Sequence, residues 1–171
     1  LNELKGFRVE QSPLGRVFGV FFNQNQSPVL RDINVRAALA SAIDQKDLVA
    51  QVLGGYGTPL IGPVPSAAFT ADPAQGIASS TLTAIAKQKL LSKGWMLGKD
   101  GVLQKTTGKG KTLQTTRLAF TLATGNVPEL RSAAEYLRKK WTEIGAQVTV
   151  QIYEQGDLSQ NIIRPRKYDA L

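Results

Sequence analysis

A strand, a helix and a second strand follow one another in the second half of the chain, and this succession limits the fold more than any other feature. Apolar residues alternate from Leu118 to Leu122, as is typical of a strand. A helix follows, because Asn126 and Glu129 have capping-box spacing and Gly145 marks its end. Strict alternation of apolar and polar residues returns over 147–152. A helix between two strands favours an α/β fold.

The remaining elements extend the same pattern. Residues 17–22 are apolar at nearly every position, which predicts a central strand covered on both faces. Asp44 is the predicted N-cap of a helix that ends at Gly54. The other predicted elements are helices over 35–43, 79–94 and 158–163, strands over 102–105 and from 168, and loops over 54–65 and 106–111. We therefore expect one α/β domain over residues 1–171, with a mixed β-sheet flanked by helices.

Composition excludes several kinds of site. The 171 residues include no cysteine and no histidine, so disulfides, thiolate nucleophiles, cysteine metal sites and histidine general bases are all excluded. No apolar run approaches the roughly 20 residues that a membrane-spanning helix needs. We expect no cofactor and no metal site.

The net charge of +8 permits attraction to nucleic acid or to another polyanion. The basic residues are spread along the chain, with small clusters at 138–140 and 164–167, and aromatic residues do not alternate with them. A solvated basic surface is the favoured interpretation, and a basic nucleic-acid or polyanion-binding module is the alternative.

Apparent catalytic motifs have simpler explanations. The segment 108–112 reads Gly-Lys-Gly-Lys-Thr, but a phosphate-binding loop requires glycine where Lys105 stands, so an exposed hairpin tip is predicted. Asp44 and Asp47 begin a helix, where carboxylates complement the helix dipole. Trp95 and Trp141 occupy positions that suit packing in the core. We therefore expect that this chain is not an enzyme.

Tyr56 is a candidate ligand or hinge residue, because it lies among Gly54, Gly55 and Gly57 in a loop that offers little to bury it.

Several segments, in order, resemble one known family. They are Asn23, 32–39, 42–44, 54–59, 87–91 with 94–95, 100–103, 134–137 with Trp141, 144–145 with Val148, and 168–170. Together they resemble the family 5 extracellular solute-binding proteins of ABC importers, a group of oligopeptide, dipeptide and nickel carriers. The resemblance spans almost the whole chain.

The resemblance implies a protein of two lobes that close on a peptide or a similar small solute and deliver it to a membrane permease. This chain would be part of the second lobe, without the first lobe and the C-terminal part. The full protein would be periplasmic or extracellular, a lipoprotein in some hosts, with its signal peptide removed and with membrane contact only through an anchor outside these residues. No nucleic acid is implied as a partner.

The same resemblance gives the candidate ligand-binding residues. Phe21 and Asn23 end the first predicted strand, and the loop Thr124, Gly125 and Asn126 follows a later strand. Tyr56 joins them from the loop after the paired helices. Some peptide-binding relatives have a charged residue near Phe21 or Thr124, and this chain has none at either position.

Overall fold

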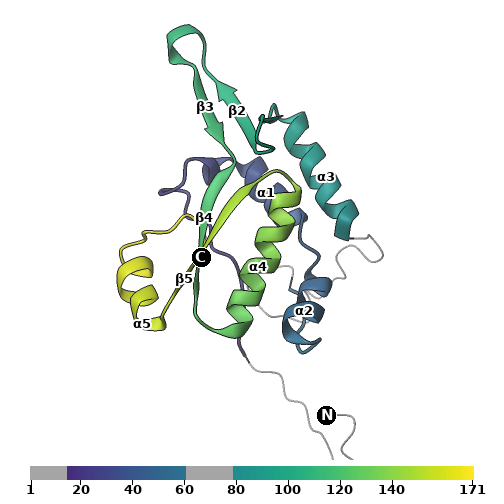
Figure 1. Cartoon of the computed structure of the whole chain (residues 1–171), viewed down its shortest axis with the longest axis vertical. Coiled ribbons are helices and arrows are strands. Elements are labelled where there is room, and N and C mark those ends of the chain that lie inside the picture. Colours follow the sequence, from purple (N-terminus) through teal and green to yellow (C-terminus); the bar gives the residue numbers. More distant parts are fainter. Residues whose placement is uncertain (1–14, 61–78) are drawn as a thin grey trace, which may run out of the picture.

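The computed structural model describes residues 15–60 and 79–171. Its centre is a strand–helix–strand unit in which β4 (Ala119–Gly125) and β5 (Gln147–Tyr153) pair in parallel, from Ala119 opposite Gln147 to Gly125 opposite Tyr153. The connecting helix α4 (Pro128–Glu143) packs against both strands (Figure 1). Parallel neighbours require such a crossover connection. This α/β unit, predicted from the sequence, is confirmed.

The sheet is mixed because the segment at Ala170 joins β4 through a single bridge, and the segment at Phe22 joins that segment in turn. Ala170 pairs in parallel with Leu122 and in antiparallel fashion with Phe22. The Asp169 carboxylate accepts hydrogen bonds from the backbone N–H and the hydroxyl of Thr121, at 2.8 and 2.9 Å. The predicted strand from 168 is therefore confirmed as a short pairing.

The prediction of a central strand over 17–22 is wrong for the described structure. Of this stretch only Phe22 forms a bridge, and it lies at the outer side of the sheet. Val17 and Phe18 are 43% and 50% exposed. Their apolar character indicated burial, but no described element covers them.

The other helices before the hairpin are η1 (Val29–Arg31), α1 (Ile33–Ser41), α2 (Gln45–Leu53) and α3 (Ser79–Ser92). Whereas α4 packs directly on β4 and β5, α2 packs on α4, and α3 packs on α1 and α4. Asp44 caps α2 by accepting from the N–H groups of Lys46 and Asp47, and Gly54 ends it in the left-handed conformation, both as predicted. The short helix near the end is present as α5 (Gln155–Asp157) and a π-helical continuation, η4 (Leu158–Ile163), which packs on β4.

The predicted capping box of α4 is absent. The N-cap residue is Val127, without a side-chain hydrogen bond, and the amide of Asn126 donates to Glu154 instead. The helix still begins at Pro128. The chain turns back after it at Gly145, whose φ is +98°.

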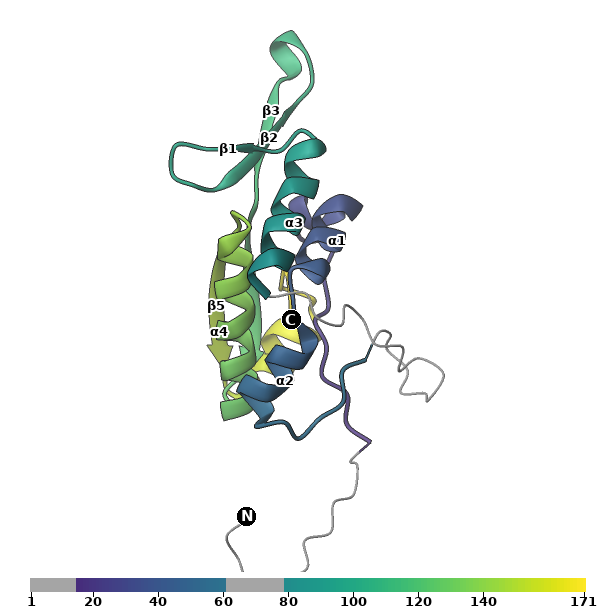
Figure 2. The ribbon, with the colours of Figure 1, turned by 90° about the vertical axis from the view of Figure 1, so that its right-hand side faces the viewer.

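A hairpin projects from one end of the molecule (Figures 1 and 2). It consists of β2 (Leu103–Thr107) and β3 (Gln114–Arg117), with β1 (Met96–Leu97) on the other side of β2 and η3 (Gly110–Thr112) at its tip. The predicted hairpin tip at 108–112 is confirmed. Its second strand is β3, whereas the alternating residues that follow form the separate strand β4.

Trp141 is the central residue of the core. Its ring lies 5.6 Å from that of Phe120 and 6.1 Å from that of Phe22, and its indole N–H donates to the carbonyl of Leu39 at 2.9 Å. Trp95 is also buried, as predicted. Within residues 15–60 and 79–171, no helix is long and apolar enough to cross a bilayer.

Candidate functional site

The carboxyl ends of β4 and β5 form one edge of the sheet, where parallel strands commonly place ligand-binding residues. Gly125 pairs with Tyr153, and the backbone N–H of Asn126 donates to the Tyr153 carbonyl at 2.8 Å. The Asn126 side-chain amide donates to Glu154 Oε1 at 2.6 Å. These bonds hold the two strand exits together, and they fix the direction of both loops.

The three candidate residues at this edge differ in access. Thr124 and Gly125 are buried, whereas Asn126 is exposed. A Cβ added to Gly125 would lie 3.4 Å from Leu130 Cδ1 and 3.6 Å from Leu158 Cδ2. Because α4 and η4 close over Gly125 in this way, Asn126 is the residue of the three whose side chain reaches solvent.

Phe21 lies toward the same end of the sheet, the end that carries the carboxyl ends of β4 and β5. Its backbone exchanges two hydrogen bonds with Leu171, at 2.8 and 3.0 Å. Since Ala170 lies between Phe22 and Leu122, the next step along this antiparallel pair brings Phe21 level with Ala123, toward the carboxyl end of β4. Phe21 is 66% exposed and is thus accessible there.

Asn23 lies toward the opposite end of the sheet, because its strand runs antiparallel to residues 169–171. Its backbone N–H donates to the Asp169 carbonyl, and its side-chain amide donates to the Arg166 carbonyl at 2.9 Å. Its Oδ1 accepts from the N–H groups of Asn25 and Gln26. The described contacts of Asn23 all organise the backbone of its own turn and of the turn at Arg166.

Tyr56 follows α2 and is 62% exposed. Its backbone N–H donates to the Leu53 carbonyl at 2.9 Å, and its ring lies 3.8 Å from the position that a Gly54 Cβ would occupy. In Figures 1 and 2 the end of α2 lies at the same end of the molecule as the β4–α4 turn, while the hairpin lies at the other. The structure thus gathers the loops of Tyr56 and Asn126 and the strand of Phe21 at one end, and separates Asn23 from them.

Glu154 is a residue of this edge that the sequence analysis missed. It follows β5 and is exposed, and its carboxylate is the partner of Asn126. The available signal was the strand–helix–strand pattern, since the carboxyl ends of parallel neighbours meet at one edge.

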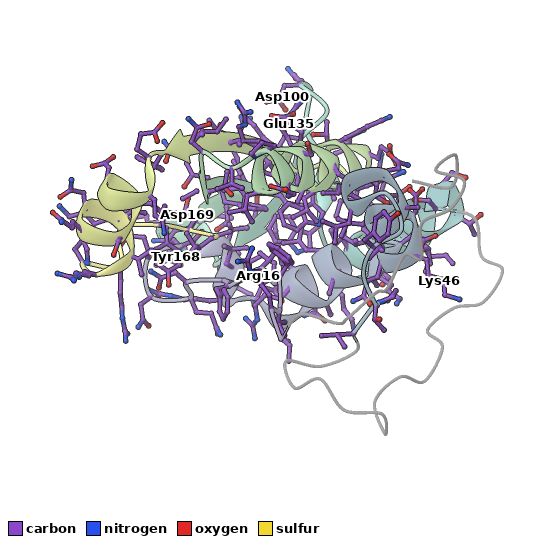
Figure 3. All side chains as sticks on the ribbon, turned by 90° about the horizontal axis from the view of Figure 1, so that it is seen from below. Arg16, Lys46, Asp100, Glu135, Tyr168 and Asp169 are labelled. Carbon is purple, nitrogen blue, oxygen red and sulfur yellow. The ribbon has the colours of Figure 1, made fainter. Side chains whose placement is uncertain are left out.

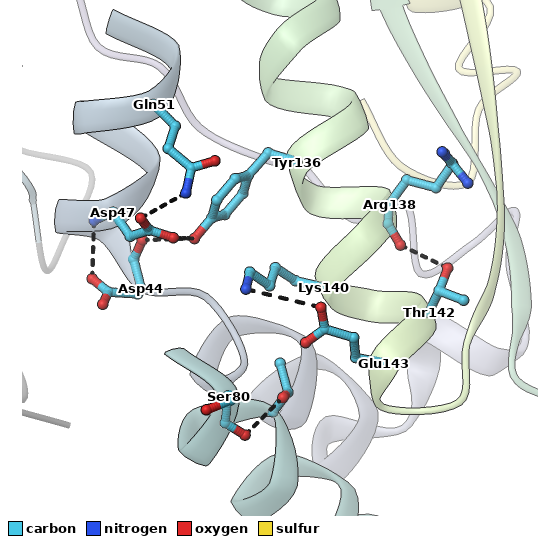
Figure 4. Close-up of polar contacts among 10 residues, drawn as sticks. Asp44, Asp47, Gln51, Ser80, Tyr136, Arg138, Lys140, Thr142 and Glu143 are labelled. Carbon is cyan, nitrogen blue, oxygen red and sulfur yellow. Dashed lines mark hydrogen bonds and ion pairs between the residues drawn. The ribbon is translucent and has the colours of Figure 1, made fainter. Parts of the chain in front are cut away.

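A second polar cluster joins α2 to α4 (Figure 4). The buried Tyr136 donates its hydroxyl to Asp47 Oδ2 at 2.7 Å, and Gln51 donates to Asp47 Oδ1 at 2.7 Å. Lys140 lies 5.6 Å above the Tyr136 ring. The hydrogen bond from Tyr136 is the largest influence on the pKa of Asp47, which is lowered from its ordinary value of 3.8. Burial, followed by the bond to Asp47, raises the pKa of Tyr136.

Three carboxyl groups of the described residues have displaced pKa values. Burial raises the pKa of Asp32, but hydrogen bonds from Asn34 and the charge of Lys105 outweigh it and lower the pKa overall. The hydrogen bond from Arg117 lowers the pKa of Asp100. Asp47, described above, is the third, and in the described residues all three displaced carboxyl pKa values are lowered. A general acid at neutral pH requires a raised pKa.

We expect Tyr136→Phe to lower the free energy of unfolding by about 1–3 kcal/mol at neutral pH, because a buried hydrogen bond to a charged group is lost. The pKa of Asp47 is lower in the folded protein than its ordinary 3.8, so the stability from its ionised form is present above that value and is lost as pH falls through the folded pKa. The difference between variant and wild type should therefore shrink on acidification. Urea unfolding at neutral pH and at about pH 3 measures it.

Tyr153→Phe is the matched control, because the Tyr153 hydroxyl donates to the neutral side chain of Gln151 at an exposed site. It should change stability little and equally at both pH values. A gap between Tyr136→Phe and wild type that stays constant on acidification would contradict the assigned role of Asp47.

Metal ligands do not gather in the part of the chain that the structure describes. No group of three or more aspartate or glutamate side chains lies close enough to hold an ion there. Figure 3 shows side chains with nitrogen at their tips on several sides of the described structure in this view.

Comparison with known proteins identifies relatives of the whole chain. The family model described as bacterial extracellular solute-binding proteins, family 5 Middle, matches residues 1–171. Among curated proteins, none matches significantly.

Three solved structures illustrate the similarity. The oligopeptide-binding protein AppA from Bacillus subtilis, in complex with a nonapeptide, has 27% identity and a TM-score of 0.66 over 88% of this chain and 29% of its own. NikZ from Campylobacter jejuni, in complex with Ni(L-His), has 27% identity and a TM-score of 0.65 over 88% and 28%. The murein tripeptide-binding protein MppA from Escherichia coli has 25% identity and a TM-score of 0.61 over 88% and 27%. The chain thus spans less than a third of each of these proteins.

Proposed function

Because this chain belongs to the bacterial extracellular solute-binding proteins of family 5, we propose that it is part of the solute-capturing component of an ABC import system. The family binds solutes and does not catalyse reactions, in agreement with the expectation that the chain is no enzyme. The match of the family model to residues 1–171 is the observation that carries the proposal.

A peptide is the proposed solute. Two of the three similar structures are named for peptides, an oligopeptide-binding protein and a murein tripeptide-binding protein. The third binds a nickel–histidine complex, so a small metal complex is the second candidate. Hydrogen bonds to a peptide backbone suit a site that tolerates varied side chains, and the polar side chain of Asn126 at an exposed sheet edge offers such bonds.

We further propose that these residues form part of the second lobe of a longer protein. The chain covers 27–29% of the three related structures, which supports its being one portion of a larger fold. In that protein a first lobe would close on the edge that carries Phe21 and Asn126, and the closed form would be delivered to a membrane permease. The proposed location is the periplasm or the outer face of the cell membrane, the latter through a lipid anchor.

Native mass spectrometry of the full-length protein, purified from its own host, tests the function. We expect a bound small solute, with peptide masses as the first choice and a metal complex as the second. Purification with nucleic acid or another polyanion and without small solute would contradict the proposal and favour the basic-module alternative.

Asn126→Ala in the full-length protein tests the site. We expect solute affinity to fall about tenfold, or about 1.4 kcal/mol, because one hydrogen-bonding side chain at the proposed cleft is lost. Isothermal titration with the identified solute measures the change.

Asn161→Ala is the matched control, because Asn161 is also exposed and also donates its amide to a carboxylate, that of Asp157. It should leave affinity unchanged. Equal affinities for both variants and wild type would show that Asn126 does not belong to the site. The family assignment would be unaffected.

A further inference from the structure

The β2–β3 hairpin extends away from the body of the fold, at the end opposite the β4–α4 turn (Figures 1 and 2). Its strands pair from Gln104 opposite Arg117 to Thr107 opposite Gln114. Every residue from 106 to 115 is exposed. The outer half of the hairpin therefore makes no part of the core, and no other described segment covers it.

The tip of the hairpin has a defined turn. Gly108 and Gly110 have φ values of +95° and +55°, which favour glycine. The backbone N–H of Lys109 donates to the Thr112 hydroxyl oxygen at 3.2 Å, and that hydroxyl donates to the Lys109 carbonyl at 2.8 Å. These bonds hold the backbone on which Lys109, Lys111 and Leu113 stand.

Charge is balanced at the base of the hairpin and unbalanced at its tip. Lys105 lies 3.7 Å from the Asp32 carboxylate, and Arg117 forms an ion pair with Asp100. No aspartate or glutamate occurs between residues 101 and 128. The described residues give neither Lys109 nor Lys111 an ion-pair partner. The positive charge of the hairpin is thus concentrated at its outermost point.

An apolar side chain stands beside these lysines. Leu113 is 59% exposed and directly follows η3. Binding of a segment to the interface of an anionic bilayer rests on electrostatic attraction and on buried apolar area, and the lysines and Leu113 offer both. A nucleic-acid surface fits less well, because the tip has no aromatic side chain for stacking.

We propose that the hairpin tip is a contact for an anionic lipid bilayer, in which Lys109 and Lys111 meet headgroup phosphates and Leu113 enters the interfacial layer. This contact lies in the chain itself and is additional to any anchor elsewhere in the protein. It does not depend on which solute is bound, because the proposed solute edge lies at the other end of the fold.

Vesicle sedimentation of the full-length protein, prepared without lipid modification, tests the proposal. The vesicles contain phosphatidylcholine alone or with phosphatidylglycerol. Wild type should partition onto the anionic vesicles only, and less at high salt. Lys109→Gln with Lys111→Gln should reduce partitioning about tenfold or more at low salt, since each basic residue near an anionic surface contributes about fivefold. Leu113→Ser should also reduce it.

Arg164→Gln with Lys167→Gln is the matched control, because it removes the same charge from exposed residues of another basic cluster. It should leave partitioning within about twofold of wild type, since a local contact depends on position and not on net charge. Equal losses in the two double variants would overturn the proposal. So would wild-type binding to heparin without binding to anionic vesicles. Solute binding, measured on the same samples, reports separately on the proposed function.

Discussion

Trp141→Ala is expected to lower the free energy of unfolding by about 3–5 kcal/mol, because it removes a large, fully packed side chain. Trp141 is 1% exposed and its ring lies beside those of Phe22 and Phe120, which belong to the two segments on either side of Ala170 in the sheet. Its indole also bonds to the carbonyl of Leu39 in α1. One substitution would therefore loosen α4, α1 and the sheet together. Urea unfolding followed by circular dichroism measures the loss.

Trp141→Phe separates packing from hydrogen bonding. It keeps an aromatic ring but leaves the buried Leu39 carbonyl without the indole N–H, so a loss of about 1–3 kcal/mol is expected. An alanine variant no less stable than the phenylalanine variant would show that the ring contacts contribute little.

Gly145→Ala is expected to cost about 2–5 kcal/mol, from left-handed backbone strain and from overpacking together. Gly145 has φ +98°, and an added Cβ would lie 2.8 Å from Leu103 Cγ. Leu103 is fully buried and its backbone N–H donates to the Gly145 carbonyl, so neither partner can withdraw without breaking this junction. The same unfolding measurement applies.

Gly94→Ala is the matched control for this prediction. Gly94 also follows a helix and has φ +84°, but an added Cβ would meet only Lys105 Cε, at 3.9 Å. Its cost should be about 1–2 kcal/mol, from the backbone alone. Equal losses at Gly94 and Gly145 would show that Leu103 yields to the extra methyl group.

Helix ends were predictable from sequence because local chemistry determines them. The carboxylate of Asp44 satisfies free N–H groups of α2, and Gly54 and Gly145 take positive φ values that other residues resist. The prediction that Asn126 caps α4 was wrong because a partner distant in sequence determines its hydrogen bond. Its spacing from Glu129 fits a capping box, but its amide bonds to Glu154, a residue that only the paired β5 brings near.

Strand pairing depended on distant partners and was harder to predict. The apolar run at 17–22 indicated burial, yet the described structure pairs only its last two residues, Phe21 with Leu171 and Phe22 with Ala170. The hairpin loop was predicted correctly. The sequence did not show that one strand ends at Arg117 and another begins at Ala119. Residues 114–117 are all polar, so apolar alternation marks only the strand that follows the break.

The candidate site residues came from the family resemblance, and the structure shows how they are arranged on the sheet. Thr124, Gly125 and Asn126 lie at the carboxyl edge of the sheet, and the exposed Phe21 is on that side of it. Asn23, only two residues from Phe21, lies toward the other end because its strand runs in the opposite direction. Strand direction is a property of the assembled sheet, so sequence position alone could not separate these two residues.

The bond between Asn23 and Arg166 joins residues 143 positions apart, and it bears on how the protein matures during synthesis. The unit β4–α4–β5 is contiguous in sequence and can assemble before distant segments join it. The strand around Phe22 must wait for Ala170 to emerge. Until then Phe21 and Phe22 have no partner strand, and an unpaired apolar segment of this kind is prone to aggregation or chaperone binding.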